Sequence, residues 1–108
     1  MSSQDKANEI LHRELAEAIS QIVEFPEGLI TVTGVDCASS FDSAKVFVSV
    51  LPDNLTGSAL RALQRSSGRI MEQIKKRVKF RRLPRLYWIF DPIERDYEKM
   101  EKMMRDID

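Results

Sequence analysis

The residues best suited to chemistry in this sequence form a run of cations. Residues 74–85 read IKKRVKFRRLPR, with seven Lys or Arg and no acid. The wider segment 61–85 holds ten basic residues and one acid, Glu72, for a charge of 10 − 1 = +9, while the remainder carries 7 − 16 = −9. Seven of the ten are Arg, whose planar guanidinium suits phosphate. A neutral chain polarised in this way predicts one surface that binds polyanions.

The residue types that catalysis or metal binding requires are scattered. His12 is the only histidine and Cys37 the only cysteine. Neither has a second ligand or a base at a matching spacing. The sequence also lacks a phosphate-binding loop, a dinucleotide fingerprint and a nucleophile elbow. We therefore expect a protein that is not an enzyme, with no catalytic residue, no metal site and no cofactor, in which His12 is a surface or boundary residue and Cys37 is buried or half-buried.

The composition is typical of one soluble domain. The chain has 108 residues, 43% of them apolar and 31% charged, which predicts a single domain over residues 1–108. A lone cysteine excludes an internal disulfide and is typical of a reducing compartment. No apolar run approaches the roughly 20 residues of a membrane helix. The polar N-terminus does not resemble a secretory signal, so we expect a cytoplasmic protein.

The first element that must position these cations is a helix over residues 4–23. Its apolar residues recur at steps of three and four, which places them on one stripe. Ser2 and Asp5 are spaced as a capping pair at its start. Pro26 cannot continue the helix and Gly28 permits a turn, so the helix ends before them.

Two strands are expected next, over residues 29–36 and 44–51. Both are rich in β-branched residues, and the second alternates strictly between its two faces. The polar link between them is short, which predicts an antiparallel hairpin. Gly34 is expected to form a bulge or bend in the first strand.

A second helix is predicted from Ser58 to about Lys79, with Thr56 as its N-cap. Gly68 interrupts its middle and costs about 1 kcal/mol against alanine there. We expect a kink at Gly68 or a break into two helices. The cations and the apolar residues fall on opposite sides of this segment, so the helix presents its charge to solvent.

Residues 86–90 are apolar and aromatic throughout and are expected to form a third strand at the centre of the sheet. Asp91 and Pro92 then begin a last helix that reaches about residue 107. The complete order predicts an α+β fold, in which helices cover one face of a small three-stranded sheet.

The basic segment has a simpler interpretation as a solvated helix face. A solvated face normally mixes both signs of charge, and this one does not. Arg61, Arg65 and Arg69 also repeat one helical turn apart, where like charges cost about 0.2–0.5 kcal/mol per pair. An anionic partner would offset that repulsion, so polyanion binding is the favoured interpretation.

Three kinds of anionic partner remain open. A basic amphipathic helix can lie on a membrane, but the apolar side of this helix is needed for the core. An acidic protein, including a second copy of the chain, is another alternative. Nucleic acid is favoured because Gly68 allows a phosphate backbone to approach closely, and a helix beginning after it would offer free N–H groups. KH domains clamp a backbone with such a glycine-containing turn between helices.

Several strings resemble the ribosome-binding factor A family of bacterial small-subunit assembly factors. VTGVD leading to AKVFVSVL is similar to that family's strand pair. ALRALQRSSGRI is similar to the end of its second helix and the start of its third. VKFRRLPRLYWIFD is similar to its basic segment, proline turn and last strand. The resemblance covers residues 7 to 107.

The resemblance implies a type II KH-like domain with the order α-β-β-α-(kink)-α-β-α. It also implies that an Ala-x-Gly kink replaces the KH glycine loop, which here is Ser66-Ser67-Gly68. The chain departs from the family's usual residues at Ser40, Ser66, Met71 and Arg85, where Asp, Ala, Arg and Glu are common.

These observations together predict a set of RNA-binding residues. The cations supply phosphate contacts and the kink sets how closely the backbone approaches. The set is Arg61, Arg65, Ser66, Ser67, Gly68, Arg69, Lys75, Lys76, Lys79, Arg81, Arg82 and Arg85.

The function that the resemblance implies is binding of the immature 30S subunit and its 16S rRNA. The protein would assist rRNA processing, especially in the cold, and would associate with free 30S particles rather than 70S ribosomes. We expect a monomer that does not bind membranes. The rival functions are a module that binds an acidic protein and a protein of the membrane surface.

Overall fold

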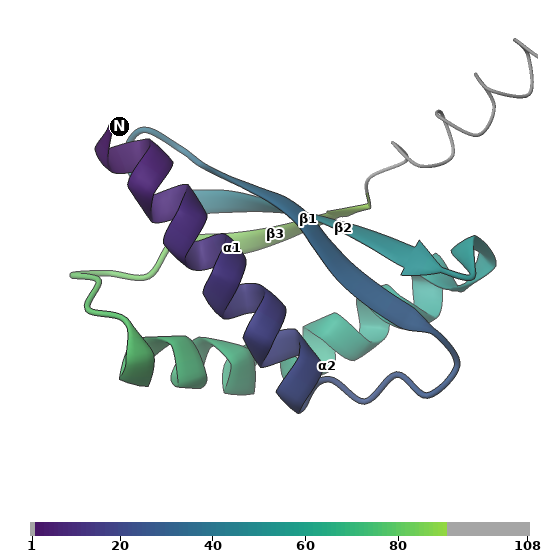
Figure 1. Ribbon diagram of the computed structural model, residues 1–108. Helices are drawn as coiled ribbons and strands as arrows, with labels where there is room; N and C mark the ends of the chain where they lie inside the picture. The colour runs from purple at the N-terminus through teal and green to yellow at the C-terminus, as the bar shows by residue number, and fades with distance from the viewer. Residues whose placement is uncertain (1, 91–108) are drawn as a thin grey trace, which may run out of the picture.

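The computed structural model describes residues 2–90 of the chain (Figure 1). In chain order the elements are α1 (Ser3–Ile22), β1 (Leu29–Cys37), β2 (Ser43–Leu51), the short 3-10 helix η1 (Asp53–Leu55), α2 (Thr56–Arg77) and β3 (Arg85–Phe90). The helix expected between residues 91 and 107 lies outside the described residues.

Helix α1 begins where the sequence predicts. Ser2 precedes it in an extended conformation, and its Oγ accepts a hydrogen bond from the Asp5 backbone N–H at 3.1 Å. That bond satisfies one of the free donors of the first turn. The apolar stripe of α1 is buried along its length, including Leu11, Leu15 and Ile19.

Strands β1 and β2 form the predicted antiparallel hairpin, paired from Leu29 with Leu51 to Cys37 with Ala44. The register shifts between Val32 and Gly34, which confirms an irregularity at the glycine. On β2 the face made by Ala44, Val46, Val48 and Val50 is buried. That face joins residues of both helices in one core cluster, so the helices cover one face of the sheet.

The prediction that the third strand lies at the centre of the sheet is wrong. The sheet order is β1-β2-β3, with β3 parallel to β2 at an edge of the described sheet. Leu86, Trp88 and Phe90 pack against the core, whereas Tyr87 points to the other face and is 47% exposed. The uninterrupted apolar pattern of β3 thus combines a core face with an exposed apolar face.

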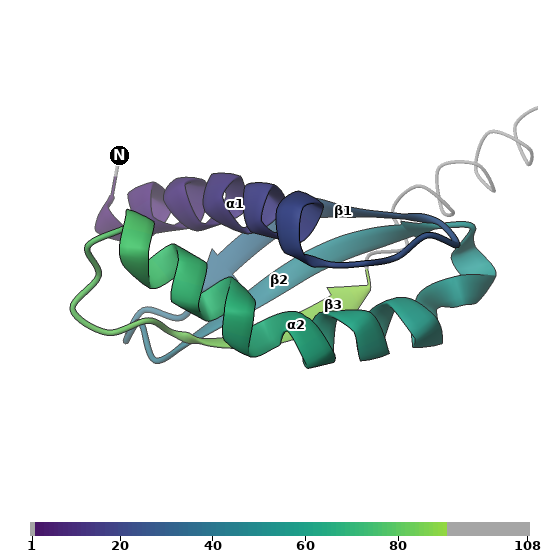
Figure 2. The ribbon, with the colours of Figure 1, turned by 90° about the horizontal axis from the view of Figure 1, so that it is seen from below.

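The sequence left either a kink or a break at Gly68 open, and α2 is one continuous helix and not two. It bends in its middle, where its colour passes from teal to green (Figures 1 and 2). Thr56 is not its N-cap, because η1 leads directly into the helix and Leu55 takes that position without a side-chain hydrogen bond. Figure 2 shows the second half of α2 beside α1, with the strands behind them.

Candidate nucleic-acid interface

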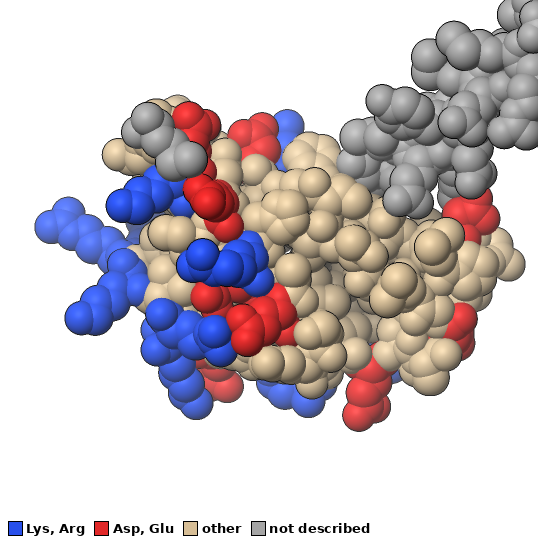
Figure 3. Space-filling model, in the orientation of Figure 1, with Lys and Arg blue, Asp and Glu red and all other residues tan. Residues whose placement is uncertain are grey.

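The nine predicted site cations are all exposed. Five of them lie on α2 and three on the segment 78–84 that leads to β3. The five are Arg61, Arg65, Arg69, Lys75 and Lys76, and the three are Lys79, Arg81 and Arg82. Figure 3 shows Lys and Arg side chains gathered at the end of the molecule where α2 stops and residues 78–84 turn toward β3. The fold therefore brings together the cations of the last turns of α2 and of residues 78–84, while Arg61 and Arg65 lie on the first half of α2.

Arg85 is the exception among the predicted cations. It is the first residue of β3, paired with Ser43, and its guanidinium lies 5.8 Å from the centre of the Tyr87 ring. Side chains at Arg85 and Tyr87 share the sheet face that the helices leave uncovered. Arg85 therefore belongs to a different surface from the cations of α2.

Arg77 lies within the basic segment but has internal partners. Its Nε lies 2.8 Å from Oε2 of Glu14, and its Nη2 lies 3.0 Å from Oε2 of Glu17. The Glu14 side chain is only 8% exposed, and its Oε2 accepts no aligned hydrogen bond within the described residues, so the close contact with Arg77 is chiefly electrostatic. A buried carboxylate requires such a partner. Arg77 therefore fastens the end of α2 to α1, and it is not among the predicted site residues.

The three residues of the expected kink have different surroundings. Ser66 is buried with 4% exposure, Ser67 is half-buried and Gly68 is exposed. The serine at position 66 therefore faces the core, and a partner can meet only the backbone, Gly68 and the exposed part of Ser67 there.

Gly68 is not required by the packing of the protein itself. Its backbone has no left-handed conformation, and a Cβ built at this position meets no atom within 4 Å. Because α2 is continuous, no new helix begins after Gly68 to offer free N–H groups, and that expectation is wrong. The open space above Gly68 remains available to an outside group.

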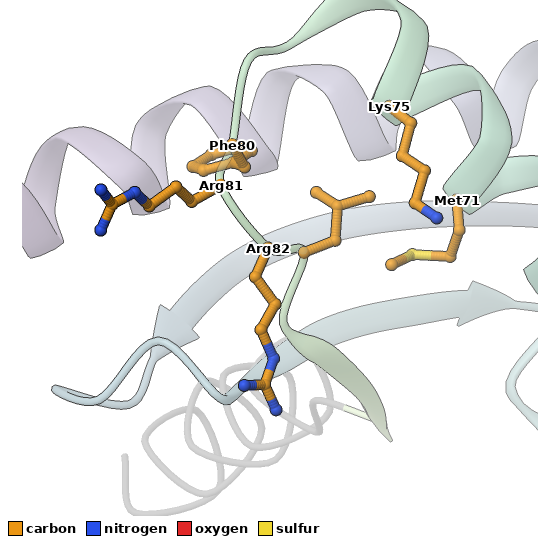
Figure 4. Close-up of a pocket in the computed structure, with 6 residues that line it drawn as sticks. Met71, Lys75, Phe80, Arg81 and Arg82 are labelled. Atoms are coloured by element: carbon orange, nitrogen blue, oxygen red, sulfur yellow. The ribbon is translucent and has the colours of Figure 1, made fainter.

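A pocket of about 610 Å³ lies between the last turns of α2 and the segment 78–84. It is lined by Met71, Lys75, Phe80, Arg81, Arg82 and Leu83 (Figure 4). The sequence pattern identified its cations but not its apolar residues, because Met, Phe and Leu in such a segment are ordinarily assigned to the core. Their position beside the cations is a property of the fold.

Within residues 2–90, the pocket cations make one ion pair with an acidic side chain, and it is weak. Arg82 Nη2 lies 3.9 Å from Asp42 Oδ1, and both side chains are well exposed. An exposed pair at this distance contributes little to stability. Arg82 is therefore held loosely and can exchange this partner for another anion.

The residues considered for catalysis have structural contacts. His12 Nε2 lies 3.1 Å from the carbonyl oxygen of Val32, which links α1 to β1. Cys37 is buried, and burial followed by the nearby Asp36 raises the pKa of its thiol. A raised pKa keeps the thiol protonated and unreactive near neutral pH. Within residues 2–90 no cluster of potential metal ligands is present and no helix is long and apolar enough to cross a membrane.

A sequence profile described as Ribosome-binding factor A matches residues 3–104. The chain belongs to the ribosome-binding factor A family. Ribosome-binding factor A of Akkermansia muciniphila is 31% identical over 104 residues, which is 96% of this chain and 83% of the relative.

Solved structures of the family have the same fold. The crystal structure of ribosome-binding factor A from Thermus thermophilus has a TM-score of 0.72 at 34% identity, over 82% of this chain and 94% of that chain. A homology model of the Thermus thermophilus factor, fitted into the cryo-EM map of its 30S complex, has a TM-score of 0.67 at 36% identity, over 77% and 89%. These comparisons confirm the resemblance and the α+β fold, and the element order is consistent with a KH-like domain of type II.

Proposed function

We propose that this chain binds the small ribosomal subunit during its assembly, through the exposed cations of α2 and of segment 78–84. The observation that carries the proposal is the collection of eight exposed cations at this part of the surface, within a family whose Thermus thermophilus member was fitted into a map of a 30S complex. The protein acts as a monomeric RNA-binding domain in the cytoplasm, contacts 16S rRNA and assists its processing, including in the cold.

The mechanism is phosphate neutralisation combined with recognition of shape. Each cation that meets a phosphate releases a condensed counterion, which favours binding at low salt. Arg65 and Arg69 lie on either side of Gly68, where the open space lets an RNA backbone approach α2 closely. Ser66 and Ser67 fix the position of that surface from beneath. The protein holds one rRNA conformer and needs no covalent step, so it is not an enzyme.

The predicted cations differ in their expected contributions. Arg65, Arg69, Lys75 and Lys76 on α2, with Lys79, Arg81 and Arg82 beyond it, form the main contact surface. Arg61 lies farther toward the start of α2 and extends this surface. Arg85 contacts RNA only if the RNA also reaches the uncovered sheet face.

Sucrose-gradient fractionation of a lysate tests this function. We expect the wild-type protein with free 30S particles rather than 70S ribosomes, and Arg65→Gln combined with Arg69→Gln should shift most of it to the top fractions. The matched control is Lys99→Gln with Lys102→Gln, which removes the same charge outside the basic segment and should leave the 30S peak unchanged.

Three results would contradict the proposal. The first is wild-type protein that sediments independently of 30S particles. The second is protein that remains in heavy fractions after the RNA is digested. The third is protein that floats with anionic vesicles. The second result indicates an acidic protein partner and the third a membrane surface.

A further inference from the structure

The pocket beside the basic surface contains more apolar surface than phosphate binding requires. Met71 and Lys75 lie one turn apart on α2, and their side chains face the segment that carries Arg82 and Leu83 (Figure 4). Phosphate contacts need donors and positive charge, and they draw no benefit from a thioether or an aromatic ring. The apolar lining therefore suggests a second part of the ligand.

The apolar wall of this pocket is held firmly. Phe80 and Leu83 are half-buried and pack against the core cluster, which restricts their movement from behind. Met71 is half-buried on α2 and lies outside that cluster. Its flexible and polarisable side chain adapts to a flat group placed against it.

The rim of the pocket carries positive charge. Lys75, Arg81 and Arg82 are exposed. In Figure 4 the Arg81 side chain extends away from Lys75, and the Arg82 side chain extends toward the sheet. Cations that diverge in this way match successive phosphates along a chain better than one isolated anion.

We propose that this pocket receives one unstacked base of single-stranded RNA. The base stacks on Phe80 and contacts Met71 and Leu83, while Lys75 and Arg82 hold the phosphates on its two sides. Proteins that bind single strands combine a positive groove with an aromatic stacking surface in this manner. A duplex cannot occupy the pocket, because its bases are stacked inside the helix. The inference rests on the proposed function and specifies which form of RNA this part of the site takes.

The pocket lies within the size range of small-ligand sites, so a free nucleotide has the same base and phosphate chemistry. A strand differs from a nucleotide in having phosphates on both sides of the base. The divergent cations on the rim favour the strand.

The test compares single-stranded and duplex RNA. Fluorescence anisotropy would measure the affinity of a labelled strand of about eight nucleotides, within the usual site size, and of a duplex of the same length. Met71→Ala and Phe80→Leu remove pocket surface without changing charge. The control is Leu29→Ala, which removes an exposed apolar side chain from the uncovered sheet face.

Phe80→Leu should weaken single-strand binding by at least about fivefold, the lower end of what one stacked base contributes, and Met71→Ala should weaken it measurably through the lost contact. Duplex affinity should change less than twofold, and the dependence on salt should stay that of the wild type. Leu29→Ala should match the wild type throughout. Met71→Ala is the safer variant for folding, because Met71 lies outside the buried core cluster.

Three outcomes would overturn the pocket assignment alone, and a fourth would also overturn the proposed function. Unchanged single-strand affinity in folded Met71→Ala and Phe80→Leu would show that the base does not enter, even if RNA binding itself persists. An equal loss for duplex would show a general effect on the surface. Competition by adenosine monophosphate at micromolar concentration would show a free-nucleotide site. A wild-type protein that binds neither RNA would refute the proposed function as well.

Discussion

Gly68 is the residue at which stability and binding make opposite demands. It is exposed within α2, and an added Cβ would meet nothing within 4 Å. Alanine is favoured over glycine in a helix by about 1 kcal/mol. Gly68→Ala should therefore raise the free energy of unfolding by about 0.5–1 kcal/mol, as measured by urea denaturation.

The larger variant Gly68→Val should fold, yet it should weaken binding to 30S particles, because its side chain fills the space that the RNA backbone needs. If Gly68→Ala instead destabilised the protein, the glycine would be needed for the bend in α2. Normal 30S binding by Gly68→Val would remove Gly68 from the interface.

Arg77 differs from the neighbouring cations of the basic segment because its guanidinium pairs with acidic side chains of α1. Removing its charge by Arg77→Gln leaves the buried Glu14 carboxylate with only the exposed Arg13 guanidinium, whose Nε lies 4.0 Å from Oε1, and this should cost about 1–3 kcal/mol of stability. Adding Glu14→Gln to this variant should recover part of the loss, because no unpaired charge then remains. A double-mutant cycle in urea measures this coupling directly.

The RNA affinity of folded Arg77→Gln provides the second readout. We expect an unchanged dependence on salt, since this guanidinium already contacts Glu14 and Glu17. Additive effects of the two substitutions on the free energy of unfolding would mean that Arg77 and Glu14 are not coupled. A salt dependence as weak as that of a surface-cation variant would mean that Arg77 contacts RNA.

At the scale of elements, hydrophobic periodicity located most boundaries within two residues. The predicted helix over 4–23 is observed at Ser3–Ile22, and both hairpin strands begin and end close to their predicted positions. In each of these elements the spacing of apolar residues distinguishes a helix from a strand without reference to distant parts of the chain. The N-cap of α2 was missed because a 3-10 turn precedes it, which the capping pattern does not reveal.

The errors at this scale arise where distant contacts decide the outcome. The glycine penalty at Gly68 is small, and burial of Ser66 and Ile70 on either side favours a continuous helix. Position in a sheet depends on which strand pairs with which, so the composition of β3 did not reveal that it lies at an edge. In the candidate site, charge identified the cations, but the pairing of Arg77 with Glu14 joins two distant helices and is invisible to local patterns.

For the molecule as a whole, the basic segment of the sequence forms a surface of exposed cations. Cations gather where α2 ends, and the acids of α1 that lie near them, Glu14 and Glu17, are paired with Arg77. The remaining cations of that end therefore project into solvent with little internal neutralisation. This arrangement suits a polyanion and gives binding a strong dependence on salt.

The most direct test of this account is the salt dependence of RNA affinity. Log affinity should fall linearly with log salt, by about 0.7 to 0.9 per phosphate, and engagement of roughly four to six cations gives a slope of about −3 to −5. The double variant Arg81→Gln with Arg82→Gln should flatten that slope by about one to two units. It should also weaken binding to RNAs of unrelated sequence. Lys99→Gln with Lys102→Gln should leave it unchanged. Equal flattening by the two double variants would mean that only net charge matters, and the basic surface would not be a binding site.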